Sequence, residues 1–220
     1  MINWNSIDTV LLDMDGTLLD LHFDNYFWQE YVPLKYAEKH GISLEQSKAE
    51  LDPRFAQTHG KLQWYCLDYW RKELDLDIVA MKQEIAHLIS FRPYADTFLQ
   101  SIKDAGKEVI MITNAHRDSL SLKLERLSMA HYFDRLISSH DYGYPKENQL
   151  FWCRLEEEIG LNKSRALFID DGVNILDAAK TFGIANLLAI RYPDSQKSAW
   201  DTGSYNAVED YRDLLIKPHE

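Results

Sequence analysis

The sequence predicts an α/β protein with a Rossmann-like, doubly wound parallel sheet and an inserted α-helical cap domain. Short, continuously apolar and partly β-branched runs recur along the chain, and the clearest of them end abruptly in a polar residue. Strands buried on both faces of a parallel sheet have this pattern. Helical stretches separate the runs, and this alternation is typical of βαβ units.

The predicted strands follow one another at 9–12, 108–112, 135–138, 165–169 and 186–190, and the third of them is the weakest. Predicted helices separate the later strands at 95–105, 119–128, 147–160 and 174–182. The tail from 191 to 220 is polar, with one helical patch at 208–215. Residues 1–20 and 93–220 are therefore expected to form one core domain of ordinary size.

The stretch 21–92 contains no convincing strand pattern, and we expect it to fold as a small helical bundle, the cap domain. Pro33 is suited to the first position of a helix, and Gly41 to its end. Ser43 and Gln46 have the spacing of a capping box, and Asp77 can cap the apolar periodicity that follows it. The chain thus predicts a helical insertion after the first strand.

Composition excludes several classes of partner. The 220 residues carry a net charge of −11, which repels phosphate backbones and anionic lipids, so neither nucleic acid nor a membrane surface is expected as a partner. No basic N-terminal region with a long apolar stretch indicates a signal peptide or a membrane span. Cys66 and Cys153 match no disulfide or zinc spacing, which fits a reducing cytoplasm. We expect a monomer or a homodimer.

Polar side chains follow three of the predicted strands directly. They are Asp13 and Asp15, Thr113 and Asn114, and Asp170 and Asp171. Open α/β sheets bind ligands at the carboxyl ends of their strands. Carboxylates that converge there repel one another unless a cation lies among them, and a set of oxygen ligands suits Mg²⁺. Because bound Mg²⁺ typically bridges carboxylates to a phosphate, the pattern indicates phosphoryl chemistry.

The spacing of Asp13 and Asp15 allows both carboxylates to face one crevice, because Gly16 lets the chain turn where the strand ends. One carboxylate can then attack a phosphorus atom while its neighbour transfers the proton of the leaving group. A structural alternative is an Asx-turn at the strand end, with Thr17 capping a helix.

Four ordered motifs resemble those of the haloacid dehalogenase superfamily. They are LLDMDGTLLD at 11–20, MITN at 111–114, Lys146 in the third position, and FIDDGVNILDAAKTFGI at 168–184. The insertion at 21–92 resembles the helical cap of subfamily I. The resemblance implies a Mg²⁺-dependent phosphatase in which Asp13 is the nucleophile and Asp15 the general acid and base. It also implies that Thr113 and Asn114 bind phosphoryl oxygens.

The resemblance further implies that Lys146 neutralises the transition state and that Asp171 binds the metal, together with Asp13 and the backbone carbonyl of Asp15. Two positions depart from the family pattern. Lys146 follows a proline where the family usually has lysine before proline, so a solvated lysine is the alternative, and Lys163 is a weaker substitute. Ile175 stands where a second acidic residue is usual, which leaves open whether Asp170 or Asn174 completes the metal shell.

Three stretches, LLDMDGTLLDLHFDNYFW, WYCLDYW and GYPKENQ, resemble purine 5′-nucleotidases of this superfamily. This likeness implies hydrolysis of a purine nucleoside 5′-monophosphate, GMP or IMP, through an aspartyl-phosphate. Bases stack on aromatic side chains. The aromatic candidates for substrate binding are Phe23, Trp28, Trp64, Tyr65 and Tyr69, with core packing as the alternative for each. Asp24 and Asn25 can contact ribose or base, or can cap the first cap helix.

Other functions use the same core. A sugar-phosphate phosphatase or a phosphomutase is the nearest alternative, and a non-catalytic phosphate-binding protein is a more distant one. Dehalogenases of the superfamily lack the second aspartate of the first motif, so Asp15 favours phosphate esters over haloacids as substrates.

Overall fold

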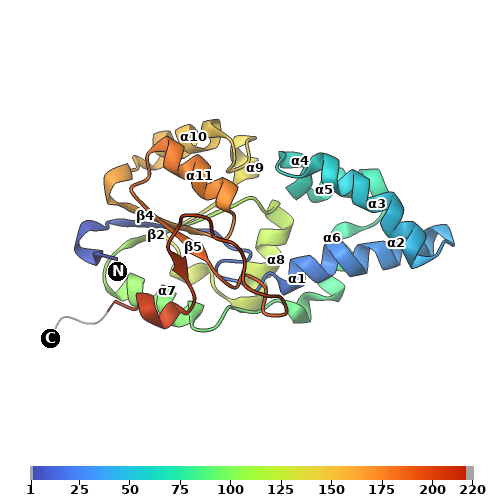
Figure 1. The fold of residues 1–220 in the computed structure, drawn as a ribbon, viewed down its shortest axis with the longest axis horizontal. Helices are drawn as coiled ribbons and strands as arrows, with labels where there is room; N and C mark the ends of the chain where they lie inside the picture. Colours follow the sequence, from blue (N-terminus) through green and yellow to red (C-terminus); the bar gives the residue numbers. More distant parts are fainter. Residues whose placement is uncertain (1, 217–220) are drawn as a thin grey trace.

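A computed structural model describes residues 2–216 and contains one six-stranded parallel sheet in the order β3-β2-β1-β4-β5-β6 (Figure 1). The strands are β1 (Thr9–Leu12), β2 (Glu108–Thr113), β3 (Arg135–Ser138), β4 (Ala166–Asp170), β5 (Asn186–Ile190) and β6 (Ala207–Val208). The doubly wound parallel sheet predicted from the sequence is confirmed.

The register of the sheet aligns the ends of the central strands. Leu12, the last residue of β1, pairs with Met111 of β2 on one side and with Ile169 of β4 on the other. The strand order reverses its direction between β1 and β4, and such a switch point opens a crevice at the carboxyl ends of the strands. The residues that follow β1, β2 and β4 therefore meet at one edge.

Helices cover both faces of the sheet (Figure 1). They are α7 (Ala95–Asp104) and α8 (Arg117–Leu127) on one face, and α9 (Ser139–Tyr142), α10 (Gln149–Ile159) and α11 (Val173–Phe182) on the other. Alternate residues of one strand serve the two faces, as pleating requires: Val10 and Leu12 pack on the side of α7, and Leu11 packs on the side of α10. A hydrophobic core therefore lies on each face of the sheet, and strand residues contribute to both.

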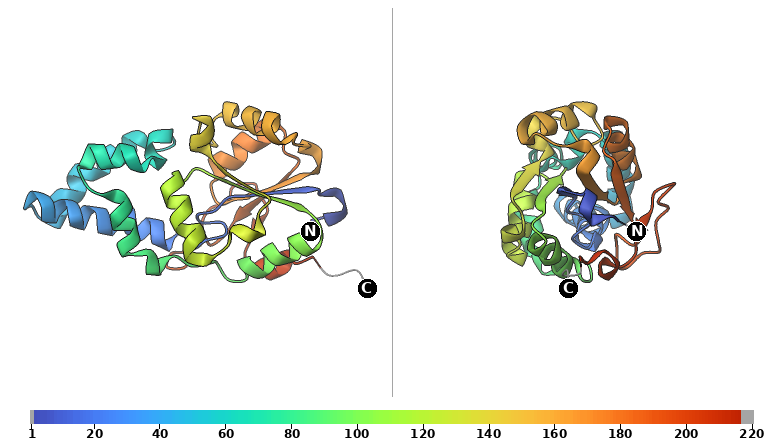
Figure 2. Two further views of the ribbon diagram at one scale, coloured as in Figure 1. Left: turned by 180° about the vertical axis from the view of Figure 1, so that it is seen from behind. Right: turned by 90° about the vertical axis from the view of Figure 1, so that its left-hand side faces the viewer.

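The remaining helices form a helical lobe that projects beyond the carboxyl ends of the strands (Figure 2). The lobe contains α1 (His22–Tyr26), α2 (Val32–His40), α3 (Leu44–Thr58), α4 (Leu62–Tyr65), α5 (Leu67–Leu74) and α6 (Ile78–Glu84). Its apolar side chains, among them Phe27 and Trp70, join the same core as Val10 of the sheet. All the regular structure in 21–92 is helical, apart from a single bridge between Leu19 and Phe91 at its edge. The boundaries of a separate cap domain stay a prediction.

Two predicted helix ends, at Gly41 and Ser43, are confirmed, and Pro33 lies one residue from its predicted position. Gly41 ends α2 in the left-handed region, and Ser43 caps α3 through a reciprocal capping box. Pro33 lies in the first turn of α2, as its second residue, and the chain before it is already helical from His22 through a π-helical turn at Phe27–Tyr31. A π-turn shifts the hydrogen-bond pattern, and such irregular turns accompany a proline that cannot donate.

The tail differs from its prediction. In place of a helical patch at 208–215, the chain forms the two-residue strand β6 and then a short 3₁₀ helix, Tyr211–Leu214. Tyr211 is buried against Phe98 and donates to the carbonyl of Thr17, so the tail packs beneath the first turn of the site. Within residues 2–216, no helix has the length and apolar character needed to span a membrane.

Candidate active site

Gly16 shapes the turn that follows β1. Its φ is +84°, a conformation that side chains rarely adopt, and its amide donates to the carbonyl of Leu19 at 2.9 Å. A β-carbon at this position would lie 2.4 Å from Oδ2 of Asp171. Glycine is therefore required both by the backbone and by the close approach of the Asp171 carboxylate, which brings the first and fourth motifs into contact.

Lys146 lies at the centre of the site and is only 1% exposed. Its Nζ is 2.5 Å from Oδ1 of Asp13 and 2.7 Å from Oδ2 of Asp170, and it also donates to the carbonyl of Ile112 at 3.3 Å. Burial alone would lower the pKa of Lys146, but the charges of Asp13 and Asp170 raise it above its ordinary value. The reversed order of proline and lysine thus still delivers the ammonium group to Asp13, and Lys146 is no solvated surface lysine.

Lys163, the weaker substitute, lies away from this cluster. It precedes β4, at the opposite end of the sheet from Asp170. Its Nζ pairs with Glu156 at 3.0 Å and lies over the ring of Phe182. Lys163 therefore has a surface environment that gives it no access to Asp13.

Three carboxylates converge beside Lys146. Oxygens of Asp13, Asp170 and Asp171 lie within 4.8 Å of one another. Burial raises the pKa of Asp13 to about 6, against the opposing charge of Lys146. Burial, together with the charges of Asp170 and Asp13, raises the pKa of Asp171 well above its ordinary value.

This donor set fits a hard cation. All the ligand atoms are oxygens, and a divalent ion among them would relieve the repulsion that raises these pKa values. Asp170 already accepts from Lys146 and from the amide of Gly172 at 2.8 Å, so each of its oxygens accepts one hydrogen bond. Oδ1 of Asn174 lies near the same turn, 3.2 Å from a β-carbon placed on Gly172.

Asp15 turns away from the carboxylate cluster. Its Oδ1 accepts from Nζ of Lys123 at 2.6 Å, and its side chain is 21% exposed. Burial raises the pKa of Asp15 to about 6, with Asp24 and Asp13 adding to the rise and Lys123 opposing it. A carboxyl group with a pKa near neutrality can both give and take a proton, which suits a general acid and base.

Thr113 is the last residue of β2 and Asn114 follows it, and both side chains already form hydrogen bonds beside Lys146. Oδ1 of Asn114 accepts from the amide of Lys146 at 2.9 Å, while its Nδ2 donates to Glu147 at 3.0 Å. Oγ1 of Thr113 accepts from the amide of Ala115. In this arrangement Asn114 positions the loop that carries Lys146.

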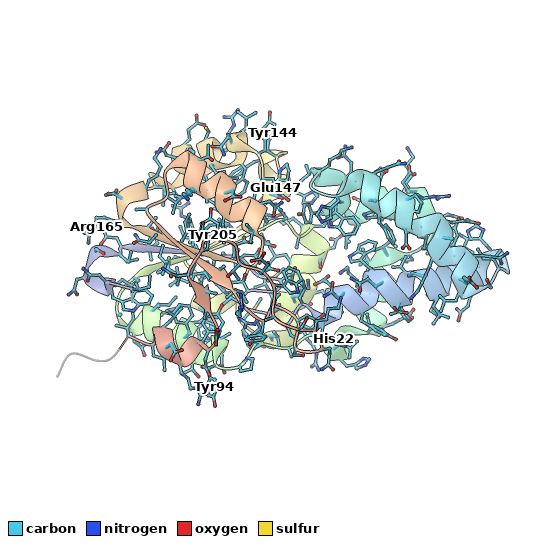
Figure 3. The ribbon with its side chains drawn as sticks, viewed as in Figure 1. His22, Tyr94, Tyr144, Glu147, Arg165 and Tyr205 are labelled. Atoms are coloured by element: carbon cyan, nitrogen blue, oxygen red, sulfur yellow. The ribbon has the colours of Figure 1, made fainter. Side chains whose placement is uncertain are left out.

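Glu147 joins this loop to the helical lobe. Its second oxygen accepts from the hydroxyl of Tyr65 at 2.8 Å, and Tyr65 ends α4 of the lobe. Figure 3 shows Glu147 on the side of the sheet that faces the lobe. A chain of hydrogen bonds therefore runs from Tyr65 through Glu147 and Asn114 to the backbone of Lys146.

Asp24 is the centre of a buried ion network. Its two oxygens accept from Lys82 at 2.7 Å and from Lys123 at 2.6 Å, and the two lysines are almost completely buried. Although burial opposes its ionisation, Lys123 and Lys82 lower the pKa of Asp24 far below its ordinary value. The network links α1 and α6 of the lobe to α8 and to Asp15.

Replacing Asp24 by alanine should destabilise the protein by about 3–5 kcal/mol, because two buried ammonium groups lose their shared partner. Urea unfolding measures this difference. The matched control is Glu38→Ala, which removes an exposed partner 3.1 Å from Lys35 and should cost at most about 1 kcal/mol. Equal losses for the two variants would contradict a structural role for the network.

A cavity of about 870 Å³ lies between the sheet edge and the helical lobe. All the site residues predicted in the core line it: Asp13, Asp15, Thr113, Asn114, Lys146, Asp170 and Asp171. Of the predicted cap residues, Asp24, Asn25, Trp28 and Trp64 also line it. Ligand sites commonly have volumes of about 300–1,000 Å³. The cavity can therefore hold a mononucleotide-sized molecule.

The predicted cap residues differ in how free their side chains are. Asn25 donates to Asp194 at 2.6 Å and accepts from Gln29, and both oxygens of Asp24 are engaged by lysines. Tyr69 does not reach the cavity: it packs edge-on against Trp70, with ring centroids 5.0 Å apart. The helix breaks at Cys66 between α4 and α5, so the cavity receives Tyr65 instead of Tyr69.

Several residues that line the cavity were not among the predicted site residues. Lys82 approaches from α6, and Phe55 and His59 approach from α3 and the turn after it. Lys123 forms the bridge from Asp15 to Asp24 without lining the cavity. Among these positions the sequence indicates only Phe55, through the aromatic enrichment of the insertion. Long-range ion pairs such as those of Lys123 leave no local pattern in the sequence.

The sheet topology, the switch-point crevice and the carboxylate cluster beside a buried lysine define the class of protein. The model of the haloacid dehalogenase-like hydrolases matches residues 7–183, and the chain belongs to this family. The predicted superfamily and the prediction of an enzyme are thereby confirmed.

Three proteins show which members of this family the chain is similar to. The chain is 44% identical over 214 residues to the GMP/IMP nucleotidase YrfG of Escherichia coli, covering 97% of this chain and 96% of the relative. A phosphoglycolate phosphatase of Neisseria gonorrhoeae is 25% identical over 192 residues, 80% of this chain and 77% of the relative. Among solved structures, a HAD phosphatase from Thermococcus onnurineus superposes with a TM-score of 0.78 at 21% identity, covering 94% and 96% of the two chains. The chain is thus similar to phosphatases of the family.

Proposed function

We propose that the protein is a Mg²⁺-dependent phosphatase that hydrolyses purine nucleoside 5′-monophosphates such as GMP and IMP. One observation carries the proposal. The buried carboxylate of Asp13 lies at the end of β1, in contact with Nζ of Lys146, and faces a cavity that extends to the tryptophans of the lobe. The identity of 44% with a GMP/IMP nucleotidase supports the same choice of substrate.

Asp13, Asp170 and Asp171 would hold Mg²⁺, with the backbone carbonyl of Asp15 and the side chain of Asn174 as further oxygen donors in the same loops. When bound, Mg²⁺ supplies charge neutralisation at the phosphate oxygens. Asp170 would also orient Lys146 and the turn at Gly172, because each of its oxygens accepts one hydrogen bond and keeps a lone pair for the metal.

The proposed reaction has two steps. An oxygen of Asp13 attacks phosphorus, the bond from phosphorus to the nucleoside oxygen breaks, and Asp15 gives its proton to that leaving oxygen. Asp15 then takes a proton from water, which attacks the phosphorus of the aspartyl-phosphate, so that inorganic phosphate leaves and Asp13 is regenerated. Lys146 stabilises the negative charge on the reacting oxygens, and Asn114 holds the lysine loop in place.

The nucleoside would occupy the part of the cavity inside the helical lobe. Trp28, Phe55 and Trp64 pack together there with ring centroids about 6 Å apart, and each of them lines the cavity. A purine stacked on such a surface gains about 1–3 kcal/mol. A phosphate ester without an aromatic group would gain nothing from these side chains.

A panel of phosphate esters tests the proposal. Phosphate release is measured from GMP, IMP, sugar phosphates and p-nitrophenyl phosphate, each with Mg²⁺ and with EDTA. We expect kcat/KM for GMP or IMP to exceed that for any sugar phosphate by at least about tenfold, consistent with the stacking energy, and EDTA to abolish turnover. Equal rates on sugar phosphates would overturn the choice of substrate, and undiminished activity in EDTA would overturn the metal dependence.

Replacing Trp64 by leucine should raise KM for GMP by about 5- to 100-fold, the loss of one stacking partner. Activity on a sugar phosphate should change by less than about twofold, because that substrate has no aromatic ring to stack on Trp64. The matched control is Tyr69→Leu, which removes an aromatic ring of the same lobe outside the cavity. If both variants raise KM for GMP equally, the increase is not caused by the loss of stacking on Trp64.

A further inference from the structure

Three soft or borderline ligands lie together at the contact between the helical lobe and the core. They are Sγ of Cys66 and imidazole nitrogens of His116 and His140, and these atoms lie within 4.8 Å of one another. Cys66 stands between α4 and α5 of the lobe, His116 precedes α8, and His140 belongs to α9. The cluster is separate from Asp13, Asp170 and Asp171, which offer oxygens only.

Within the described residues, the imidazole of His140 lacks one hydrogen bond. Its Nε2 is buried and has no hydrogen-bond partner among residues 2–216. Burial, with the neighbouring His116, lowers the pKa of His140 to about 4, although backbone groups of Asn114 and Tyr65 oppose this. At neutral pH the ring is therefore uncharged, which is the form that binds metal ions. A buried nitrogen without a hydrogen-bond partner is a candidate ligand for a bound ion.

The surroundings of His116 suit a metal ligand as well. Its Nδ1 accepts from the amide of Asp118 at 3.4 Å and so caps α8, with Oδ2 of Asp118 3.5 Å away, and Oδ2 of Asp68 lies 3.8 Å from its Nε2. Metal-binding histidines commonly direct their second nitrogen to a carboxylate, which fixes the ring orientation. The imidazoles of His116 and His140 lie edge to face with centroids 5.1 Å apart, so their nitrogens can converge without a large ring rotation.

We propose that Cys66, His116 and His140 bind Zn²⁺ and thereby tie the helical lobe to the core. One thiolate and two imidazoles are typical zinc ligands, and bond lengths of ~2.0–2.3 Å in a tetrahedron place neighbouring ligand atoms about 3.3–3.6 Å apart. The separations of up to 4.8 Å thus need to shorten by up to about 1.5 Å, a side-chain movement. Binding releases the thiol proton of Cys66 to solvent, and water takes the fourth position.

The proposed zinc site lies where a bound ion would affect access to the cavity. His116 itself lines the cavity, while Cys66 follows Tyr65, whose hydroxyl reaches Glu147. A bound ion would hold the α4–α5 turn against the loop after β2 and so restrict access to the cavity. Inhibition of turnover by Zn²⁺ in the presence of Mg²⁺ follows from this, and it rests on the proposed function, whereas zinc binding does not.

Cobalt spectroscopy tests the binding. The protein is titrated with Co²⁺ in the presence of Mg²⁺, and a thiolate-to-cobalt charge-transfer band is expected in the near ultraviolet, since carboxylate sites produce none. The band should be displaced by one equivalent of Zn²⁺. The two cysteines offer a matched pair: Cys66→Ser should abolish the band, and Cys153→Ser, which changes an exposed cysteine, should keep it. A band that persists in Cys66→Ser would overturn the proposal.

Two further measurements separate the site from the proposed catalytic chemistry. Competition with a zinc chelator should show at least about tenfold weaker affinity in His140→Ala than in the wild type. Cys66→Ser should keep its turnover with Mg²⁺ and lose its inhibition by Zn²⁺. A wild-type protein that shows the cobalt band but hydrolyses no phosphate ester would contradict the proposed function alone, and one that hydrolyses GMP without the band would contradict the zinc site alone.

Discussion

Asp13→Asn should reduce turnover of every phosphate ester to background, a loss of at least about 10⁴-fold, as expected when a nucleophile is removed. The amide has nearly the shape of the carboxylate, but it cannot form the aspartyl-phosphate. The measurement is phosphate release from GMP and from p-nitrophenyl phosphate by the purified variant. Both substrates must fail together, because the phosphoryl site is common to them.

The fold should survive this change. Nζ of Lys146 keeps Asp170 at 2.7 Å, and the substitution removes one of three mutually repelling carboxylates. We therefore expect the thermal midpoint to be no lower than that of the wild type. Retained turnover, in a sample whose peptide mass excludes reversion of the amide to aspartate, would refute the role of Asp13. A collapsed midpoint would instead show that the loss of activity is structural.

The strand ends were the most predictable part of the molecule. Apolar runs identify buried strands, and a parallel topology places the residues that follow them at one edge, so the sequence alone groups Asp13, Thr113 and Asp170. The grouping depends on a rule of chain geometry and on no side-chain detail. That rule does not predict hydrogen bonding, so it does not indicate that Asn114, which lines the cavity, also binds the backbone of Lys146 and the side chain of Glu147.

The helical lobe was less predictable for a physical reason. Its ion pairs join residues far apart in the chain, with Lys82 and Lys123 meeting at Asp24 across 58 and 99 positions. Nothing in the sequence around Lys82 or Lys123 distinguishes them from solvent-exposed lysines. Their side chains become buried only where three helices pack together. The same reasoning applies to Tyr65 and Tyr69: a helix break at Cys66 decides which ring enters the cavity, and no composition or periodicity marks that break.

Lys146→Met should lower kcat for GMP by at least about 10²–10³-fold, the effect of removing one preorganised group that stabilises transition-state charge. The methionine keeps much of the volume of the buried stem and deletes only the ammonium group. Asp13 and Asp170 then face each other without their shared cation, so the free energy of unfolding without added metal should also fall, by about 3–5 kcal/mol. Steady-state kinetics and urea unfolding measure the two effects.

Lys163→Met is the matched control, because it deletes an ammonium group of the same kind at the opposite end of β4. Lys163 pairs with Glu156 at the surface, where such pairs contribute about 0–1 kcal/mol. Its kcat should stay within about twofold of the wild type, since no reacting group is within its reach. If Lys163→Met lost activity and Lys146→Met kept it, the third motif would have to be assigned to Lys163. The burial of Lys146 between Asp13 and Asp170 predicts the opposite.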